Sequence, residues 1–445
     1  MPHLNDDLSV IRNMRSKIQT VSNFSRAITV TTPCFRPDEE KHLREIFVEN
    51  IDKNILARGN GLSYSDCCIL SHGIMIDARR LNHLLEFDED SGIAVCQGAA
   101  TFADLFLLSP DFIPPVLPGT LYATLAGGVA HDVHGKNNHI HGSLGRHIAW
   151  LELQTGKETF HCSADKNPDL FTATIAGLGL TGVIKRIGIR LQKNTRYVTQ
   201  YTEKHMDWPG LLQRMQEEGI QHQYQVAWLD LMNEPRAVLS FADHVDCDAH
   251  AENILQETWA VPKFPVRLIT SWGMKQFNRA YFYWSKSGSK VLPLWKFNNP
   301  LDCIKNWNYL YGKKGLLQFQ AVFPGEQAIG ALERLTQIIR QYKALPTLAV
   351  LKYFTRPGSG LLSFVKPGFT LAVDFVHNQQ ARQAIDAMNQ AIVALGGSIY
   401  LAKDLFLTRQ QFAEMYPWHQ EFIEILNRYQ SPMASDLSQR LGLTP

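Results

Sequence analysis

A glycine-rich turn follows an apolar run in the stretch ILARGNGLSYSD, which covers residues 55–66. Gly59 and Gly61 tolerate positive φ angles, and Asn60 tolerates them better than most residues do. Backbone N–H groups in such a turn can point toward one place, where they form a cradle for an anion such as a diphosphate. A plain hairpin turn uses the same residue types. The turn therefore indicates an anion site only if other parts of the chain support it.

Two further glycine clusters supply that support. The stretch PPVLPGTLYATLAGGVAHDVHGKNNHIHGSLGRH begins at Pro114 and combines a rigid proline-rich start with many glycines, five histidines and one lysine. The stretch AGLGLTG, residues 176–182, precedes the apolar run VIKRIGIRL. Such sequences are poor core material, but they let the backbone approach a flat polar ligand closely. Three clusters of this kind favour a ligand-binding role over simple turns.

The elements that must position these turns change in character along the chain. In the first predicted domain, residues 1–195, short apolar runs such as GIMIDA and GIAVCQG alternate with turns and brief helical stretches. In the second, residues 196–397, longer strands alternate with amphipathic helices near 326–343 and 379–395. Long strands with helices on one face predict a domain built on an antiparallel sheet.

The C-terminal segment, residues 398–445, begins with SIYLAKD and continues with a helical stretch over 408–430. It is too short to bury a core of its own, so we expect it to pack back onto the first domain. The chain as a whole is therefore predicted to be an α+β protein with two domains.

Composition and charge exclude several classes of protein. The chain has 445 residues, of which 45% are hydrophobic, and this suits two domains with sizeable cores. The formal net charge is only +2, with acidic and basic residues interspersed, so we expect no nucleic-acid partner. The seven cysteines show no C-x-x-C spacing, which argues against a metal site and suits a reducing compartment.

No secretory or membrane-crossing pattern is visible. The N-terminal MPHLNDDLSVIRNMRSK lacks a basic start followed by an apolar core, and no uncharged apolar run reaches about 18 residues. We therefore expect a cytoplasmic protein. The segment 285–314, however, has six lysines against one acid, Asp302, interleaved with aromatic residues. That composition suits a solvated loop or a peripheral contact with anionic lipid at the inner face of the plasma membrane.

The motifs occur in the order RGNGLSYSD, PVLPGTLYATLAGGVAHDVHGKNNH, GSLGRH and GLGLTGVI. This order resembles the PCMH-type FAD-binding domain of the vanillyl-alcohol oxidase superfamily of flavoproteins. The stretches LLQFQAVFP, AVLKYF, FTLAVDF and YLAKD resemble the branch of that superfamily that oxidises polyprenylphosphoryl pentoses. The resemblance covers nearly the whole chain. It implies a two-domain PCMH-type fold with the substrate domain on the antiparallel sheet.

By this resemblance the glycine clusters hold FAD, with its diphosphate and ribityl chain on the first two clusters and its adenine side along the third. Relatives that attach the flavin covalently use a histidine in the first turn, where this chain has Leu62. We therefore expect FAD to be bound non-covalently, unless His131, His134, His139 or His141 replaces that histidine. The residues implied in FAD binding are Arg58, Gly59, Asn60, Gly61, Leu62, Ser63, Tyr64, Pro118, Gly119, Thr120, Thr124, Gly127, Gly128, His134, Gly135, Gly182, Ile184 and Tyr400.

The resemblance also places Lys403, in YLAKD, at the flavin. Oxidising a secondary alcohol moves a hydride to flavin N5 and leaves negative charge near N1 and the C2 carbonyl, which a fixed cation stabilises. A lysine before an aspartate is otherwise an ordinary surface ion pair. His134 and Tyr64 are the other catalytic candidates, and a histidine at this place can accept the hydroxyl proton or hold the flavin ring.

The residues implied in substrate binding are Lys136, Gln318, Gln320, Lys352, Thr370 and Lys403. Lys352 is the most telling of them, because it lies inside the apolar strand AVLKYF, where an unpaired buried ammonium is costly. At Thr370 and Ala372 the chain departs from its relatives, which have asparagine and cysteine there. The details of the pocket therefore do not transfer.

The resemblance implies an FAD-dependent oxidase that converts the 2'-hydroxyl of a polyprenylphosphoryl-β-D-ribose-type substrate to a 2'-keto intermediate. A separate NAD(P)H-dependent reductase would complete the 2'-epimerisation to the arabinose. The same flavin domain also serves oxidases of soluble sugar alcohols and aldonolactones such as D-arabinono-1,4-lactone, because a fold alone does not fix a function. A protein that binds flavin or sugar without turnover is the third alternative.

Overall fold

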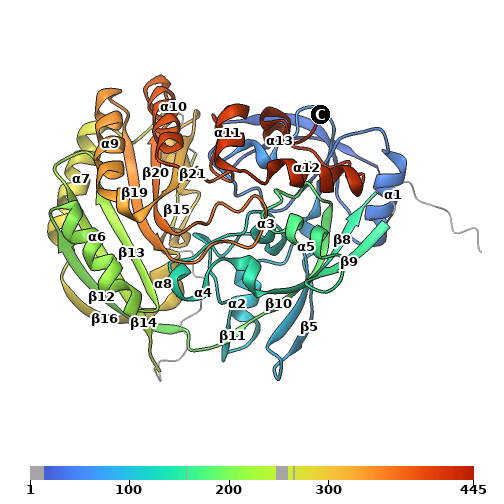
Figure 1. The fold of residues 1–445 in the computed structure, drawn as a ribbon, viewed down its shortest axis with the longest axis horizontal. Helices are drawn as coiled ribbons and strands as arrows, with labels where there is room; N and C mark the ends of the chain where they lie inside the picture. The colour runs from blue at the N-terminus through green and yellow to red at the C-terminus, as the bar shows by residue number, and fades with distance from the viewer. Residues whose placement is uncertain (1–14, 157, 247–258, 264–265) are drawn as a thin grey trace, which may run out of the picture.

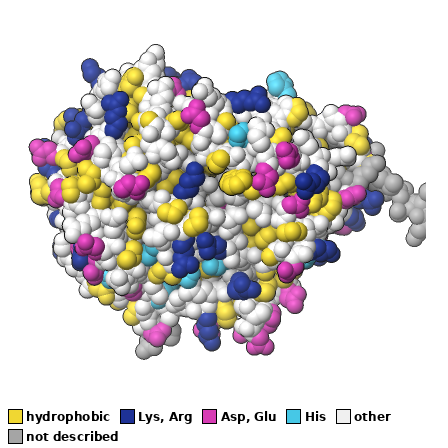
Figure 2. Space-filling view, viewed as in Figure 1, with side chains coloured by type: hydrophobic (Ala, Val, Ile, Leu, Met, Phe, Trp, Pro, Cys, Tyr) yellow, Lys and Arg dark blue, Asp and Glu magenta, His cyan; other side chains and the backbone are white. Residues whose placement is uncertain are grey.

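The computed structural model describes residues 15–156, 158–246, 259–263 and 266–445. These residues form an α+β protein with two domains side by side, as the sequence predicts (Figure 1). The N-terminal stretch that argues against a secretory signal lies almost wholly outside them. Acidic and basic side chains are interspersed over the face drawn in Figure 2. Within the described residues, no helix is both long and apolar enough to cross a bilayer.

The first domain contains two sheets and several short helices. The four-stranded sheet has the order β1-β2-β4-β3, with strands at Lys17–Ser22, Thr29–Phe35, Ile74–Asp77 and Ile55–Arg58. The five-stranded antiparallel sheet has the order β5-β6-β10-β8-β9, with strands at Leu84–Asp88, Ile93–Gln97, Val183–Arg190, Ile148–Thr155 and Glu158–Ser163. The helices are α1 (Lys41–Glu49), α2 (Phe102–Leu108), α3 (Leu125–Ala130), α4 (Asn138–His141) and α5 (Pro168–Thr174).

The second domain is built on one eight-stranded antiparallel sheet with the order β16-β12-β14-β13-β19-β20-β18-β21. In that order the strands are Gly288–Pro293, Tyr197–His205, Arg236–His244, Tyr224–Asp230, Pro346–Phe354, Gly368–Val376, Leu316–Phe323 and Ser398–Ile399. Three helices, α6 (Trp208–Glu217), α9 (Ala328–Gln341) and α10 (Gln379–Ala394), cover one face (Figure 1). The prediction of an antiparallel sheet with amphipathic helices on one face is confirmed.

Smaller elements complete the two domains. β7 (Phe112–Ile113) pairs with β11 (Gln192–Lys193), and β15 (Trp259–Ala260) pairs with β17 (Ile304–Lys305). α7 (Ser271–Trp284) packs against β14, and α8 (Leu294–Asn298) lies where the two domains meet. The side chains of Asn298 and Asn299, at the end of α8, donate to the carbonyls of Leu117 and Pro118 at 3.2 and 2.6 Å. These bonds tie the second domain to the second glycine cluster.

The segment 285–314 is therefore not one surface loop. Trp295, Phe297 and Tyr311 are buried, so the expectation that the aromatic residues of this segment face lipid is wrong for these three. The composition of the segment misleads because it does not tell which aromatic side chains fill the space between two domains.

The C-terminal segment joins both domains. β21 pairs with β18 at the edge of the large sheet, and α11 (Arg409–Met415), α12 (His419–Arg428) and α13 (Asp436–Leu441) then pass over the first domain (Figure 1). The helix expected over 408–430 is split in two, because Pro417 lacks an N–H group and disfavours a helical Tyr416. Arg440 pairs with Asp66 at 2.9 Å and fixes the end of the chain to the first domain.

Candidate active site

A cavity of about 990 Å³ lies between the two domains. Its first wall consists of the glycine clusters, its second wall is one face of the eight-stranded sheet, and the turn after β21 adds Tyr400 and Lys403. Of the residues implied in FAD binding, all line the cavity except Gly135, which lies behind the wall. Lys136, Gln318, Gln320, Lys352 and Lys403, implied in substrate binding, also line it, whereas Thr370 does not.

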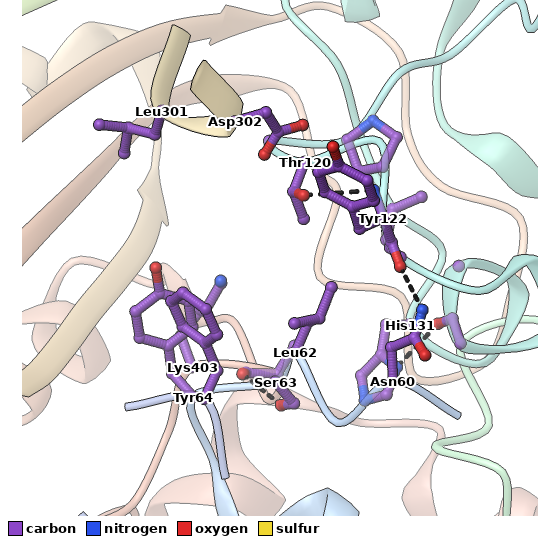
Figure 3. Close-up of a pocket in the computed structure, with 18 of the residues that line it drawn as sticks. Asn60, Leu62, Ser63, Tyr64, Thr120, Tyr122, His131, Leu301, Asp302 and Lys403 are labelled. Carbon is purple, nitrogen blue, oxygen red and sulfur yellow. Dashed lines mark hydrogen bonds between the residues drawn. The ribbon is translucent and has the colours of Figure 1, made fainter. Parts of the chain in front are cut away.

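The first turn keeps a strained backbone that only glycine accepts easily. Gly61 has a φ of +63°, and a Cβ atom there would collide with the guanidinium of Arg58. Asn60 Nδ2 donates to the Tyr122 carbonyl at 2.7 Å, which joins the first cluster to the second (Figure 3). The backbone N–H groups of residues 59–62 donate to no acceptor within the described residues. The turn therefore presents free donors at the cavity wall.

The sheet contributes side chains from alternate positions of its strands, as strand geometry requires. Gln318 and Gln320 on β18 and Asp374 on β20 share the lining face with Lys352 on β19. Gln318 lies opposite Asp374 and donates to its carboxylate. Thr370 lies on the same face, opposite Lys352 in the pairing of β19 with β20, but it does not line the cavity; its Oγ1 accepts from Gln320 Nε2 at 3.3 Å. Thr370 thus orients a lining residue without reaching the cavity.

Lys403 lies on a turn that the first domain holds in place. Ser63 Oγ and the Tyr64 N–H both donate to the Ala402 carbonyl, at 2.7 and 3.1 Å. These bonds set Lys403 Nζ 3.7 Å from the centre of the Tyr64 ring, a cation–π contact (Figure 3). Burial lowers the pKa of Lys403 to about 7, although the charge of Asp374 opposes that shift. The side chain faces the cavity and makes no surface ion pair with any residue that the structure describes.

His134 is held as a neutral ring. Gln320 Nε2 donates to its Nε2 at 2.9 Å, which leaves the ring proton on Nδ1. Burial, with Lys352 and Lys403 nearby, lowers the pKa of His134 well below its usual value. Its Nδ1 is buried without a partner among the described residues. A ring with one occupied acceptor and one free donor suits positioning a bound group better than accepting a proton.

Two more lysines face the cavity. Lys352 Nζ has no hydrogen-bond or ion-pair partner among the described residues, and burial lowers its pKa to about 8. Lys136 Nζ donates to the Phe297 carbonyl at 2.5 Å, and burial together with Lys352 lowers its pKa to about 7. Lys136 and Lys352 lie close to one another in a medium of low dielectric, which favours binding of an anionic ligand. Such a ligand would raise their pKa values and keep both side chains protonated.

Acidic residues of the cavity wall escape sequence reasoning. Asp302 closes the cavity on the side opposite Lys403 (Figure 3), accepts the Leu121 N–H at 2.8 Å and has a pKa raised by burial to about 6. Burial likewise raises the pKa of Asp374 to about 6. Lys352 can be predicted as a site residue because it is a charged residue inside an apolar strand. The same criterion also applies to Asp374 in FTLAVDF.

A cysteine–histidine pair in the first wall is also absent from the sequence predictions. Cys67 Sγ lies 3.2 Å from His131 Nε2, and His131 Nδ1 donates to the Gly127 carbonyl at 2.9 Å. A contact with the Cys68 thiol, together with His131, lowers the pKa of the Cys67 thiol. Burial alone would lower the pKa of His131, but Cys67 outweighs it and raises that pKa. The two partners are 64 residues apart in sequence, so no local sequence motif predicts the pair.

The residues present fit FAD. The unpartnered N–H groups of residues 59–62 suit the oxygens of a diphosphate, and the orphan Nδ1 of His134 suits a polar atom of a flavin ring. Leu62 offers no nucleophile, and both ring nitrogens of His131 already have partners. His139 and His141 do not line the cavity.

Comparison with known proteins agrees with this reading. Residues 34–163 match the family model described as FAD binding domain. The chain is 30% identical to decaprenylphosphoryl-beta-D-ribose oxidase of Mycolicibacterium smegmatis over 447 aligned residues, 94% of this chain and 96% of that protein.

Shorter matches join the chain to oxidases named for lactones. It is 24% identical to bovine L-gulonolactone oxidase over 42% of each chain, and 27% identical to a putative D-arabinono-1,4-lactone oxidase of Neurospora crassa over 30% of this chain and 24% of that protein. The long match at 30% identity and the FAD-domain model carry the assignment. The chain is therefore a flavoprotein that belongs to the FAD-dependent oxidoreductases with a PCMH-type FAD-binding domain, in the family of decaprenylphosphoryl-β-D-ribose oxidase.

Proposed function

We propose that this protein oxidises the 2'-hydroxyl of a polyprenylphosphoryl-β-D-ribose-type substrate to the 2'-keto sugar, the first half of a 2'-epimerisation to the arabinose. The observation that carries the proposal is Lys352, a half-buried cation at the cavity wall without a partner among the described residues. An unpaired buried ammonium is costly, and a phosphodiester bound beside it would offset that cost. The long match to a decaprenylphosphoryl-ribose oxidase supports the same substrate class.

The residues that line the cavity have different roles in binding the substrate and in catalysis. We assign Lys352 and Lys136 to the substrate phosphate, and Gln318 and Gln320 to the sugar hydroxyls. FAD, when bound, supplies the oxidant by accepting a hydride from the carbinol carbon. Lys403, fixed over the Tyr64 ring, would stabilise the negative charge that the hydride brings to the bound flavin. His134 positions the ring of the bound group through its free Nδ1, and Thr370 holds Gln320 in place.

FAD is proposed to be bound without a covalent link. The support is Leu62 at the usual attachment position and the two hydrogen bonds that occupy the ring of His131. Acid precipitation of the purified protein should therefore release a yellow supernatant. Yellow colour that stays with the pellet would overturn this part of the proposal.

The proposed product needs a second enzyme. A 2'-keto sugar becomes the epimer only when hydride is returned to the opposite face, so we infer a separate NAD(P)H-dependent reductase as partner. Because the substrate lipid is confined to a membrane, we further propose a cytoplasmic protein that meets the inner face of the plasma membrane peripherally. Incubation with polyprenylphosphoryl ribose should give a product lighter by two hydrogens in mass spectrometry, and adding such a reductase with NADPH should restore the mass as arabinose.

A soluble lactone or sugar-alcohol oxidase is the second candidate. Partial matches to lactone oxidases favour it, but they cover less than half of the chain, and a neutral lactone leaves Lys352 without a counter-charge. Mass spectrometry of the products from D-arabinono-1,4-lactone under the same conditions decides between the two. Turnover of the lactone with no turnover of the lipid-linked ribose would replace the first proposal by the second.

A further inference from the structure

The outward face of α7 is unusually apolar for a surface helix. Trp272 and Trp284 are 75% and 80% exposed, and Phe277 and Tyr283 are 55% and 61% exposed. At 3.6 residues per turn, these four side chains fall within about 140° of the helix circumference. Large aromatic side chains gathered on one exposed face mark an interaction surface rather than scattered surface residues. We call these four residues the α7 aromatic face.

The opposite side of α7 anchors the helix firmly. Phe282 and Asn278 are buried, and Asn278 Nδ2 donates to Asp230 Oδ1 at 2.9 Å. The Tyr281 ring packs on Trp228 at 4.7 Å between centroids. Lys204 Nζ donates to the Tyr283 carbonyl at 3.0 Å. The helix is therefore held mainly by its inner side, and of the aromatic face Tyr283 also touches the sheet, where the Arg236 guanidinium of β14 lies 5.4 Å from its ring centre.

The chain around α7 is rich in basic residues. Residues 259–301 contain no aspartate or glutamate, and their basic residues are Lys263, Arg267, Lys275, Arg279, Lys286, Lys290 and Lys296. Lys275 and Arg279 are exposed on one flank of the α7 aromatic face, and no carboxylate among the described residues pairs with either. Aromatic side chains beside lysine and arginine suit the headgroup region of an anionic membrane.

The same surface adjoins the opening of the cavity. Tyr281 of α7 and Lys290 of β16 line the cavity and are exposed to solvent at the same time, so one part of its opening lies beside α7. In Figure 1, α7 lies at the outer end of the second domain, away from the first. A membrane that met α7 would thus lie at the opening of the cavity.

We infer that the α7 aromatic face inserts into the headgroup region of an anionic bilayer and brings the opening of the cavity to the membrane surface. A lipid-linked sugar phosphate could then reach the cavity without leaving the bilayer. The role of this surface in substrate delivery rests on the proposed function, but its binding to lipid does not. The inference also moves the expected membrane contact from the partly buried segment 285–314 to α7.

Vesicle flotation tests the inference without any substrate. The FAD-loaded protein is mixed with phosphatidylcholine vesicles made with and without phosphatidylglycerol. The triple variant Trp272→Ser, Phe277→Ser, Trp284→Ser should lose about tenfold or more in binding to the anionic vesicles, because three aromatic side chains leave the interface. Its FAD content should stay unchanged, since none of the three lines the cavity.

A control variant removes three exposed apolar side chains elsewhere. Ile51, Leu85 and Trp418 are also exposed, at 65%, 45% and 59%, and lie outside α7. Changing these three to serine should leave vesicle binding as in the wild type. A second variant, Lys275→Gln with Arg279→Gln, should weaken binding to anionic vesicles only.

Three outcomes would overturn the inference: absence of wild-type binding, equal loss in the control variant, or full binding by the α7 triple variant. A wild-type dimer in sedimentation that the α7 variant converts to a monomer, without any vesicle binding, would make the face an interface between two copies. If the wild type binds vesicles through α7 but oxidises only a soluble lactone, the inference stands and the proposed function fails. If the protein oxidises the lipid-linked ribose but does not bind vesicles, the proposed function stands and the inference fails.

Discussion

Basic side chains gather in two regions of this molecule, the cavity and the surface around α7, and their surroundings differ. Lys136, Lys352 and Lys403 face the cavity, where burial lowers their pKa values to about 7, 8 and 7. Lys275 and Arg279 beside the α7 aromatic face are exposed to water. The first group loses part of its charge when no anion is near, whereas the second keeps its charge but is screened by salt.

The difference separates two ways of using positive charge. A buried cation acts at short range, and its partner must enter the cavity, so it can select one anionic group and stabilise charge during a reaction. An exposed cation attracts an extended anionic surface and contributes roughly 1 kcal/mol near a membrane. The cavity lysines are therefore suited to catalysis and substrate recognition. The basic residues beside α7 are suited to holding the protein at a membrane. Each prediction below tests one side of this contrast.

The largest effect is expected at Lys403. Lys403→Met should keep bound FAD but slow its reduction by substrate about 10²-fold or more, because a fixed cation no longer meets the developing negative charge. Anaerobic stopped-flow absorbance measures this rate directly. The matched control is Lys313→Met, which changes an exposed lysine outside the cavity. It should leave the rate of flavin reduction unchanged. Equal rates in both variants would place Lys403 outside the chemistry.

A smaller effect, which depends on the substrate, is expected at Lys352. Lys352→Met should raise the KM for a polyprenylphosphoryl sugar by roughly tenfold to a hundredfold, the usual loss when a hydrogen bond to a charged group is removed. The KM for a neutral lactone should hardly change. The same variant should also raise the free energy of unfolding, because an unpaired buried charge is removed. A KM that rises equally for both substrates would show that Lys352 supports the fold and not the phosphate.

The pH dependence should separate charged from neutral substrates. Lys403, with a pKa of about 7, should affect charged and neutral substrates alike. In the free enzyme the two lysines assigned to the phosphate, Lys136 and Lys352, are protonated below their lowered pKa values of about 7 and 8 and neutral above them. Only the protonated form attracts a phosphate, so kcat/KM for a phosphorylated substrate should fall as pH rises through this window. The assay compares it with a neutral substrate between about pH 6 and 10, and parallel profiles would argue against phosphate binding by these lysines.

Salt should act mainly on the exposed region. Raising ionic strength shortens the Debye length to about 3 Å at 1 M, which screens Lys275 and Arg279 far more than a buried lysine. Vesicle flotation should therefore weaken with salt, while the rate of flavin reduction by a short, water-soluble phosphosugar analogue should change little. Loss of both signals at the same salt concentration would remove the distinction between the two regions.

The parts of the site that depend on local chemistry could be predicted from the sequence. The turn after β3 is marked by Gly59 and Gly61, and Lys352 is conspicuous inside an apolar strand, so both could be predicted from residue types. Asp374 obeys the rule that marks Lys352, yet it went unnoticed. The layers of the second domain were also predictable, since helical and strand periodicities are local properties.

What could not be predicted depends on contacts between distant segments. Cys67 meets His131 only after the first two glycine clusters fold together. Trp295 and Phe297 read as exposed aromatics but fill the space where the domains meet, while Trp272 and Trp284 have the same chemistry and remain exposed. Sequence composition does not distinguish these cases, because burial is decided by the neighbouring domain.

The central claim is that the cavity contains both a flavin site and lysine side chains that bind the phosphate of the substrate. Anaerobic bleaching of the bound FAD tests it most directly, using three substrates at equal concentration: polyprenylphosphoryl ribose, an alkyl riboside of similar apolar length without the phosphate, and D-arabinono-1,4-lactone. The account predicts rapid bleaching by the phosphorylated substrate, with much slower bleaching by the other two. Bleaching by the lactone or by the uncharged riboside as fast as by the phosphorylated ribose would contradict it.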